Sequence, residues 1–106
     1  MRTVNLNQKA QMPSQPERLA RLTRHLRARL LDLGAGTPEL EQVSQEEGTI
    51  TARFPGRTAE EMMSRLCEYG VSCTGAGERV CFCIPEELPF EDLDYVWGCL
   101  FQILGS

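Results

Sequence analysis

Cysteines are the side chains of this 106-residue chain with the most specific chemistry, and two of them lie close together in sequence. Cys81 and Cys83 are two residues apart in the run RVCFC, a spacing that puts both side chains on one face of a strand. With Cys73 on a neighbouring strand, they would approach the spacing of a thiolate cluster. Structural zinc sites take four ligands, usually from two turns, and the sequence has no such pair of turns. We therefore interpret the three cysteines as small hydrophobic sheet positions and assign no metal site.

The number of cysteines also bears on the cellular compartment. The chain has an odd number, five: Cys67, Cys73, Cys81, Cys83 and Cys99. Its first ten residues lack the apolar centre of a signal peptide, and no apolar run approaches membrane-spanning length. Because reduced thiols are typical of a reducing compartment, we expect a cytoplasmic protein without membrane contact.

Other groups that could act as nucleophile or base are few. Lys9 is the only lysine and lies in a polar N-terminal segment. His25 is the only histidine, and we expect it to be solvated among the arginines of a helix. No catalytic residue is assigned from these positions.

The N-terminal third is predicted to be a flexible lead-in followed by a helix. Residues 1–15 show no hydrophobic periodicity, so we expect them to be flexible or to form an arm that packs on something else. Ser14 and Glu17 have the spacing of a capping box, with Pro16 in the first turn. Leucines then recur at helical spacing, which predicts an amphipathic helix over residues 16–34.

The remainder, residues 38–106, reads as alternating strands and helices. Residues 38–45 favour a short edge strand, and residues 49–54 alternate as a strand with one buried face. Thr58 and Glu61 predict the start of a second helix. Strands over 71–74 and 79–84 are joined by the loop Gly75-Ala76-Gly77-Glu78, and a last helix places Trp97 inward. The predicted fold is α+β, a single domain over 16–106, with a mostly antiparallel sheet and helices on one face.

Charge is unevenly distributed along the chain. Seven basic residues and one acidic residue precede residue 31, and four basic and fourteen acidic residues follow it, which gives +6 and −10. Attraction within the fold or within a dimer is the simplest interpretation. A nucleic-acid patch is not favoured, since aromatic platforms and a recognisable module are missing.

The order of motifs resembles a known family. ARFPG, AEEMMSRL, EYGVSC, TGAG, RVCF and FEDLDYVWGCL follow one another in the chain. They resemble the C-terminal small domain of fold-type I pyridoxal-phosphate enzymes, in the branch of class V aminotransferases and cysteine desulfurases. The resemblance implies that the Schiff-base lysine and the cofactor cup belong to a large domain without a counterpart here. We therefore expect no cofactor in this chain.

The resemblance also assigns roles to single positions. The loop with Gly75 and Gly77 corresponds to the loop that carries the persulfide cysteine in desulfurases, and it has no cysteine. Arg79 matches the arginine that binds a substrate carboxylate, a role that suits the planar guanidinium. It would otherwise be an exposed strand residue paired with Glu78 or Glu68.

Two hypotheses about function follow. The first is a non-catalytic, stand-alone small domain that binds a partner protein or a second copy through the sheet face away from the helices. That face would carry Arg53, Arg79, Cys81 and Cys83 as interface candidates, together with Thr49 and Thr51. The alternative is one piece of a split or cut-down aminotransferase, to which the chain supplies Arg79.

Overall fold

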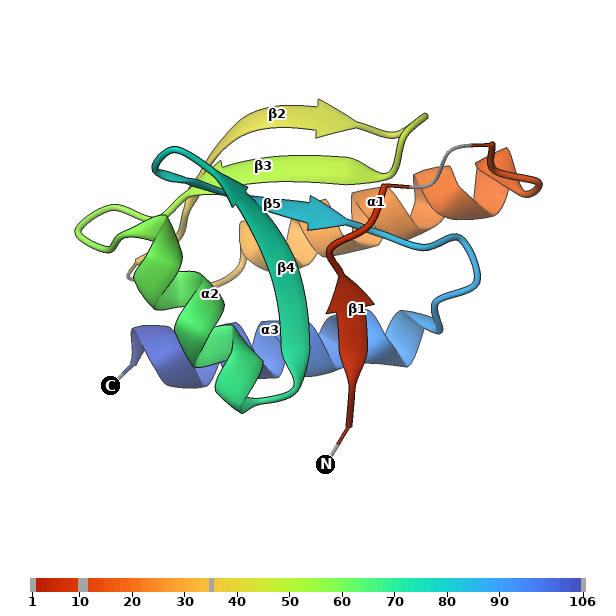
Figure 1. The fold of residues 1–106 in the computed structure, drawn as a ribbon. Helices are drawn as coiled ribbons and strands as arrows, with labels where there is room; N and C mark the ends of the chain where they lie inside the picture. The colour runs from red at the N-terminus through yellow and green to blue at the C-terminus, as the bar shows by residue number, and fades with distance from the viewer. Residues whose placement is uncertain (1, 10–11, 35, 106) are drawn as a thin grey trace.

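The fold is a five-stranded sheet with three helices, an α+β architecture as predicted (Figure 1). The computed structural model describes residues 2–9, 12–34 and 36–105. The strands are β1 (Val4–Leu6), β2 (Glu39–Ser44), β3 (Thr49–Arg53), β4 (Val71–Ala76) and β5 (Arg79–Cys83). The helices are α1 (Pro16–Leu30), α2 (Ala59–Glu68) and α3 (Phe90–Leu104). Within the described residues, none of these helices combines the length and apolarity that crossing a bilayer requires.

The sheet has the strand order β1-β4-β5-β3-β2. All neighbours are antiparallel except β1, which runs parallel to β4. The first half of β4 pairs with β1, from Val71 to Cys73, and its second half pairs with β5, from Thr74 to Ala76. Beyond β1, Asn7 forms a parallel bridge with Cys83 at the end of β5. The start of the chain is therefore inserted where β4 and β5 separate.

This strand corrects the prediction of a flexible lead-in over residues 1–15. Val4 and Leu6 are 1% and 0% exposed and belong to the core. In the run VNL, only the two buried residues Val4 and Leu6 alternate with a polar one, Asn5. This pattern is too short to predict a strand. Residues 1, 10 and 11 of the segment lie outside the described residues.

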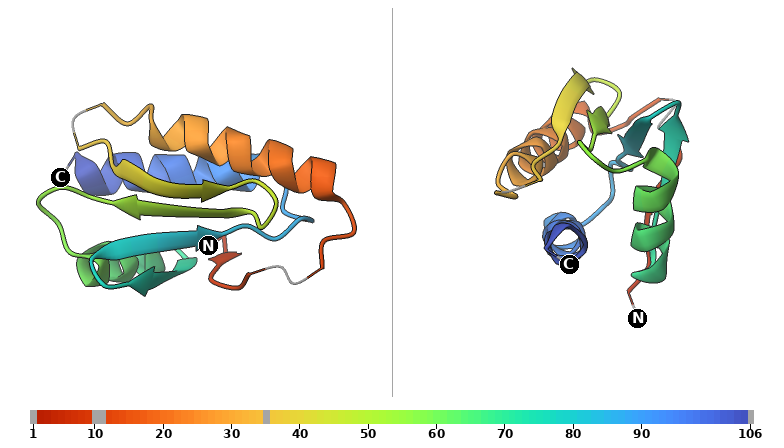
Figure 2. Two further views of the ribbon diagram at one scale, coloured as in Figure 1. Left: turned by 90° about the horizontal axis from the view of Figure 1, so that it is seen from above. Right: turned by 90° about the vertical axis from the view of Figure 1, so that its left-hand side faces the viewer.

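All three helices lie on one face of the sheet (Figure 2). Helices α1 and α3 run side by side, and α2 packs on β4. The leucine stripe of α1 is fully buried at Leu19, Leu22, Leu26 and Leu30. Helix α1 is thus an integral part of the layer, flanked in sequence by β1 and β2, rather than an element that precedes the domain; it ends at Leu30, short of the predicted residue 34.

The start of α1 is stabilised differently from the predicted capping box. The N-cap residue is Gln15, and its side chain makes no capping hydrogen bond to the first turn of the helix. The carboxylate of Glu86 accepts hydrogen bonds from Ser14 Oγ at 2.8 Å and from the Gln15 backbone N–H at 2.7 Å. A carboxylate from the loop before α3 therefore takes the place that Glu17 was expected to fill.

The predicted start and end of α2 are confirmed. Thr58 is the N-cap, and its side chain accepts a hydrogen bond from the Glu61 N–H at 3.0 Å. After the helix, Gly70 has a φ of 82°, a conformation that glycine adopts without strain.

Trp97 does not occupy the buried position predicted for it. The buried positions of α3 are Leu93, Val96, Cys99, Leu100 and Ile103. Trp97 is half-buried at the edge of the helix layer, where its Nε1 donates to the Asp32 carbonyl at 3.0 Å and its ring contacts the guanidinium of Arg29. His25, expected to be solvated, is also half-buried and hydrogen-bonded to Asp94 at 2.8 Å.

Candidate functional site

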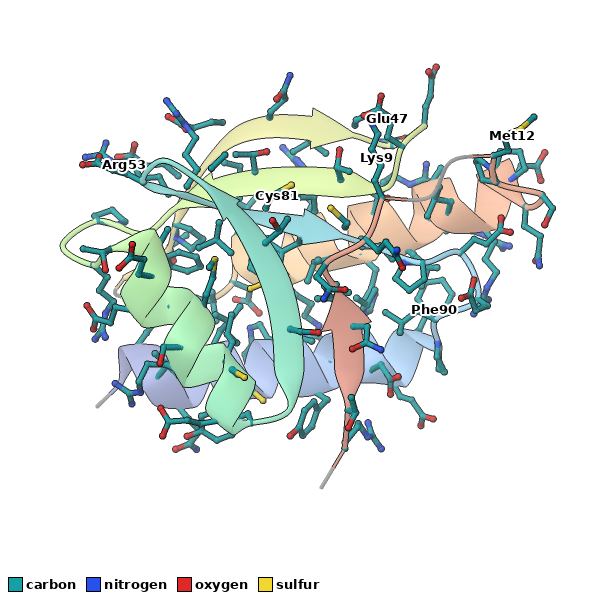
Figure 3. The ribbon with its side chains drawn as sticks, in the orientation of Figure 1. Lys9, Met12, Glu47, Arg53, Cys81 and Phe90 are labelled. Carbon is teal, nitrogen blue, oxygen red and sulfur yellow. The ribbon has the colours of Figure 1, made fainter. Side chains whose placement is uncertain are left out.

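The sheet face away from the helices, which we call the open face, carries most of the predicted site residues. Register places Thr51 beside Cys81 and Thr49 beside Cys83, and Arg53 and Arg79 lie just beyond the last β3–β5 pair, Ala52 with Val80. Figure 3 shows Cys81 and Arg53 on this side of the strands. It also shows Lys9, which follows β1, and Glu47, which lies in the turn between β2 and β3. The open face comprises Thr49, Thr51, Arg53, Arg79, Cys81 and Cys83.

The two arginines of the open face form ion pairs with three glutamates. Arg79 forms an ion pair with Glu41 of β2. Arg53 lies 3.7 Å from Glu39 and 4.0 Å from Glu78. Adjacent arginines on neighbouring strands would repel each other, and the three carboxylates offset that repulsion. Arg79 therefore has a partner other than Glu78 or Glu68, the two residues that the sequence suggested.

Glu41 could not be identified as this partner from sequence. The β2–β3 register shifts between Leu40 and Gln42, so Glu41 is the extra residue of a bulge. Regular alternation would put Glu41 on one side with Glu39, but it gives no reason to link either of them to β5. The bulge in an edge strand with two glutamates also disfavours pairing with a further strand.

The predicted loop is shorter than expected. Ala76 pairs with Arg79, which leaves Gly77 and Glu78 as the turn. Gly77 has a φ of 65°, as such a two-residue turn requires. Gly75 is a strand residue, which corrects its assignment to the loop. A Cβ at Gly75 would lie 2.7 Å from the sulfur of Met63, so glycine here allows α2 to approach β4.

The cysteines divide between the two faces of the sheet. Cys81 Sγ and Cys83 Sγ lie 3.8 Å apart on the open face. Cys73 pairs with the buried Leu6, so it points to the helix side and cannot join them. Cys83 is only 5% exposed, which corrects its place among the exposed interface candidates. Within the described residues, no group of three or more His, Cys, Asp or Glu side chains could hold a metal ion.

Burial is the main cause of the raised pKa of two of these thiols, Cys73 and Cys83. It raises the pKa of Cys73 to about 12, with smaller contributions from the neighbouring cysteines. Burial and then Cys81 raise the pKa of Cys83 to about 11, and the Lys9 ammonium acts in the opposite direction. Both thiols are therefore protonated at neutral pH and are not activated nucleophiles.

Lys9 does not fit the role of a cofactor-binding lysine. Its side chain is 55% exposed, and its Nζ pairs with Glu47 at 2.9 Å. A lysine that forms a Schiff base needs a desolvated amine, whereas the Lys9 amine is exposed to solvent and paired with a carboxylate. The residues present thus do not fit pyridoxal phosphate.

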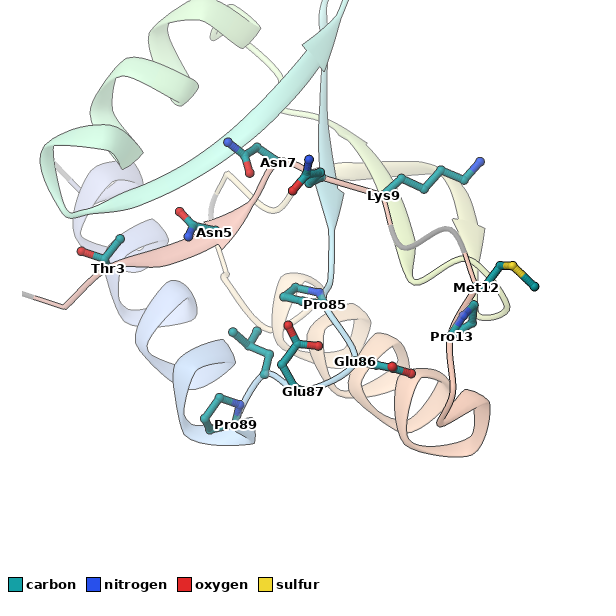
Figure 4. A pocket seen from close by; sticks show the side chains of 12 residues that line it. Thr3, Asn5, Asn7, Lys9, Met12, Pro13, Pro85, Glu86, Glu87 and Pro89 are labelled. Carbon is teal, nitrogen blue, oxygen red and sulfur yellow. The ribbon is translucent and has the colours of Figure 1, made fainter.

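A cavity lies beside β1 rather than on the open face. It has a volume of 830 Å³ and lies between the N-terminal segment and the turn before α3 (Figure 4). Asn5, Asn7 and Lys9 line one side, and Pro85 and Glu86 line the other. Its lining is polar, and sequence reasoning did not indicate it because the N-terminal segment was expected to be flexible.

Comparisons with known proteins agree on the fold. No family model matches the chain, and no curated protein matches its sequence. A NifS-like protein matches in structure with a TM-score of 0.74 and 15% identity, over 85% of this chain and 28% of that one. A transaminase from directed evolution by ancestral reconstruction matches with a TM-score of 0.66 and 16% identity, over 83% of this chain and 22% of that one. A thermostable omega transaminase from Pseudomonas jessenii matches with a TM-score of 0.64 and 18% identity, over 85% and 24%.

These likenesses confirm the resemblance at the level of fold. The chain spans about a quarter of the length of the structures it matches, 22% to 28%. It therefore shares its fold with a part of a NifS-like protein and of transaminases. At 15% to 18% identity, the likeness shows a shared fold and assigns no activity.

Proposed function

We propose that this domain has no catalytic site of its own and acts by binding a protein, either a partner or a second copy, through its open face. The observation that carries the proposal is the pairing of Arg53 and Arg79 with glutamates on that face. Their side chains are 48% and 51% exposed, so the guanidinium groups are ordered yet accessible.

An ordered array of both charges suits recognition more than stability. Exposed ion pairs contribute about 0–1 kcal/mol to folding. Complementary charges across an interface, by contrast, select partners and accelerate association. The centre of the open face is less charged, as interfaces commonly are. It consists of the half-exposed Cys81 and of Thr49 and Thr51. The free thiols are compatible with a reducing, cytoplasmic location, which forms part of this proposal.

The experiment reverses the charge on the open face and then restores the internal pair. Arg79→Glu places a second carboxylate beside Glu41 and reverses the charge that a partner would meet. We expect association to weaken at least tenfold, which corresponds to about 1.4 kcal/mol, with the melting temperature almost unchanged. Sedimentation over a concentration series measures self-association, and capture with native and variant bait measures a foreign partner.

Two further variants make the result specific. The swap Glu41→Arg/Arg79→Glu keeps the internal ion pair but leaves the charges reversed for a partner, so binding should stay weak. Arg21→Glu makes the same charge change at an exposed position of α1 and should leave binding unaffected. Equal association for all four proteins, or a loss with Arg21→Glu alone, would refute the open face as the binding surface.

A second candidate is a piece of a split or cut-down aminotransferase-like enzyme, to which Arg79 would supply a carboxylate-binding group. The exposure of Arg79 at the start of β5 favours it, although Glu41 would first have to release the guanidinium. This candidate requires that the captured partner contain bound pyridoxal phosphate. A partner without the visible absorbance of that group would rule it out and leave the binding proposal intact.

A further inference from the structure

The two thiols of the open face have the spacing of two ligands on one ion. Metal–sulfur bonds of about 2.3 Å put two sulfurs about 3.8 Å apart at a tetrahedral angle and about 4.6 Å apart when they are opposite each other. Cys81 Sγ and Cys83 Sγ are 3.8 Å apart. One ion can therefore bond to both sulfurs as they stand at a tetrahedral angle. For the opposite arrangement the two sulfurs must move about 0.8 Å apart, which rotation of the two side chains can supply without movement of β5.

The surrounding strands hold this spacing. Cys81 pairs with Thr51 on one side and with Thr74 on the other. Cys83 pairs with Thr49 and forms the bridge with Asn7. Each cysteine backbone is thus fixed from both sides, which is how ligands are positioned without a loop.

The number of ligands restricts the ion. A structural zinc site needs four protein ligands, and the described part of the chain offers no group of three or more His, Cys, Asp or Glu around these sulfurs. Soft thiolate ligands select Cu(I), and two thiolates in a near-linear arrangement are enough to hold this ion. We propose that Cys81 and Cys83 form a two-thiolate site for a soft monovalent ion of the Cu(I) type. This inference is independent of the proposed function, since it requires no partner.

The binding step balances without a change of oxidation state. Two S–H bonds break, two S–Cu bonds form, and two protons pass to solvent, so that one Cu(I) and two thiolates give a complex of charge −1. The ion enters at Cys81, which is half-exposed, because Cys83 is only 5% exposed.

The test is an anaerobic titration of the full chain with Cu(I) against a chromogenic Cu(I) chelator. The native protein should bind one equivalent. Cys81→Ser and Cys83→Ser should each weaken binding more than about a hundredfold, since loss of an outer-shell partner alone typically costs 10–100-fold. Cys67→Ser, which removes an exposed single thiol of α2, should bind as the native protein does.

Folding of the variants is checked by thermal melting, and a second measurement covers failure of the buried variant. X-ray absorption on the native protein with one equivalent of Cu(I) should show a copper centre with two sulfur neighbours. Retention of binding in Cys81→Ser, an equal loss in Cys67→Ser, or a copper centre without two sulfurs would overturn the proposal.

Discussion

Arg79 of β5 is joined by an ion pair to Glu41 of β2, across the intervening strand β3. Glu41 can reach it because the bulge at Leu40–Gln42 adds a residue to the edge strand. The pair fixes an exposed guanidinium on the side of the sheet that the helices leave uncovered. Its position, more than its small contribution to folding, makes Arg79 a candidate for recognition.

The first prediction concerns the carboxylate at the start of α1. Hydrogen bonds from the Gln15 N–H and from Ser14 lower the pKa of Glu86 from 4.5. A lowered pKa in the folded state stabilises the fold above the unfolded value, and this stabilisation is lost as the pH falls through the folded value. Glu86→Gln should therefore be less stable than the native protein at pH 7, and the difference should shrink as the pH falls below 4.5.

Glu17→Gln is the matched control, because Glu17 is the acid that the sequence pattern placed in this role. It makes the same chemical change in the first turn of α1 but should have the smaller effect at pH 7. Urea unfolding of the three proteins at pH 7 and pH 3 measures both differences. A larger loss for Glu17→Gln would restore the capping box and contradict the Glu86 contact.

A second prediction separates backbone strain from a steric clash. Gly48 has a φ of 67°, and a Cβ there would lie 2.6 Å from Cδ1 of the buried Leu19. Gly48→Ala combines left-handed strain of about 1–2 kcal/mol with overpacking of about 1–3 kcal/mol. Gly56 has a φ of 77° and nothing within 4 Å, so Gly56→Ala should show the strain alone. Equal losses in urea unfolding would mean that Leu19 of α1 does not pack against Gly48, in the turn between β2 and β3.

Side-chain size and burial make opposite predictions for two positions of α3. Leu100 is fully buried, and Leu100→Ala should cost about 2–5 kcal/mol. Trp97 is larger but only half-buried. Replacing a buried aromatic residue by alanine costs about 3–5 kcal/mol, and Trp97→Ala should cost less than the lower end of that range. A greater loss for Trp97→Ala than for Leu100→Ala would return Trp97 to the core position that its spacing suggested.

The parts of the fold that sequence predicts are those with long periodic patterns or local caps. The leucines of α1, the alternation in residues 49–54 and the Thr58 cap each depend on neighbours within a few residues. These patterns gave the α+β class and the antiparallel hairpins. Trp97 was misplaced because periodicity alone cannot distinguish the centre of a buried stripe from its edge.

The parts that sequence misses depend on contacts between distant segments. Glu86 accepts a hydrogen bond from the backbone N–H of Gln15, which lies 71 residues away in the chain. Strand β1 exists because Leu6 pairs with Cys73 and fills the core, although its own pattern is only three residues long. The same holds for the candidate site. The partner of Arg79 comes from a bulge in β2, and Cys83 is bridged by Asn7, which lies just beyond β1.

The central claim is that the open face is the binding surface, and amide NMR spectra test it most directly. Spectra of the ¹⁵N-labelled domain are compared over a dilution series, and with and without a partner obtained by capture. The account predicts that the shifted or broadened amides cluster at Thr51, Arg53, Arg79 and Cys81, and that the outer surface of α1 at Arg21 is unchanged. Shifts confined to the helix layer, or none under either condition, would contradict it.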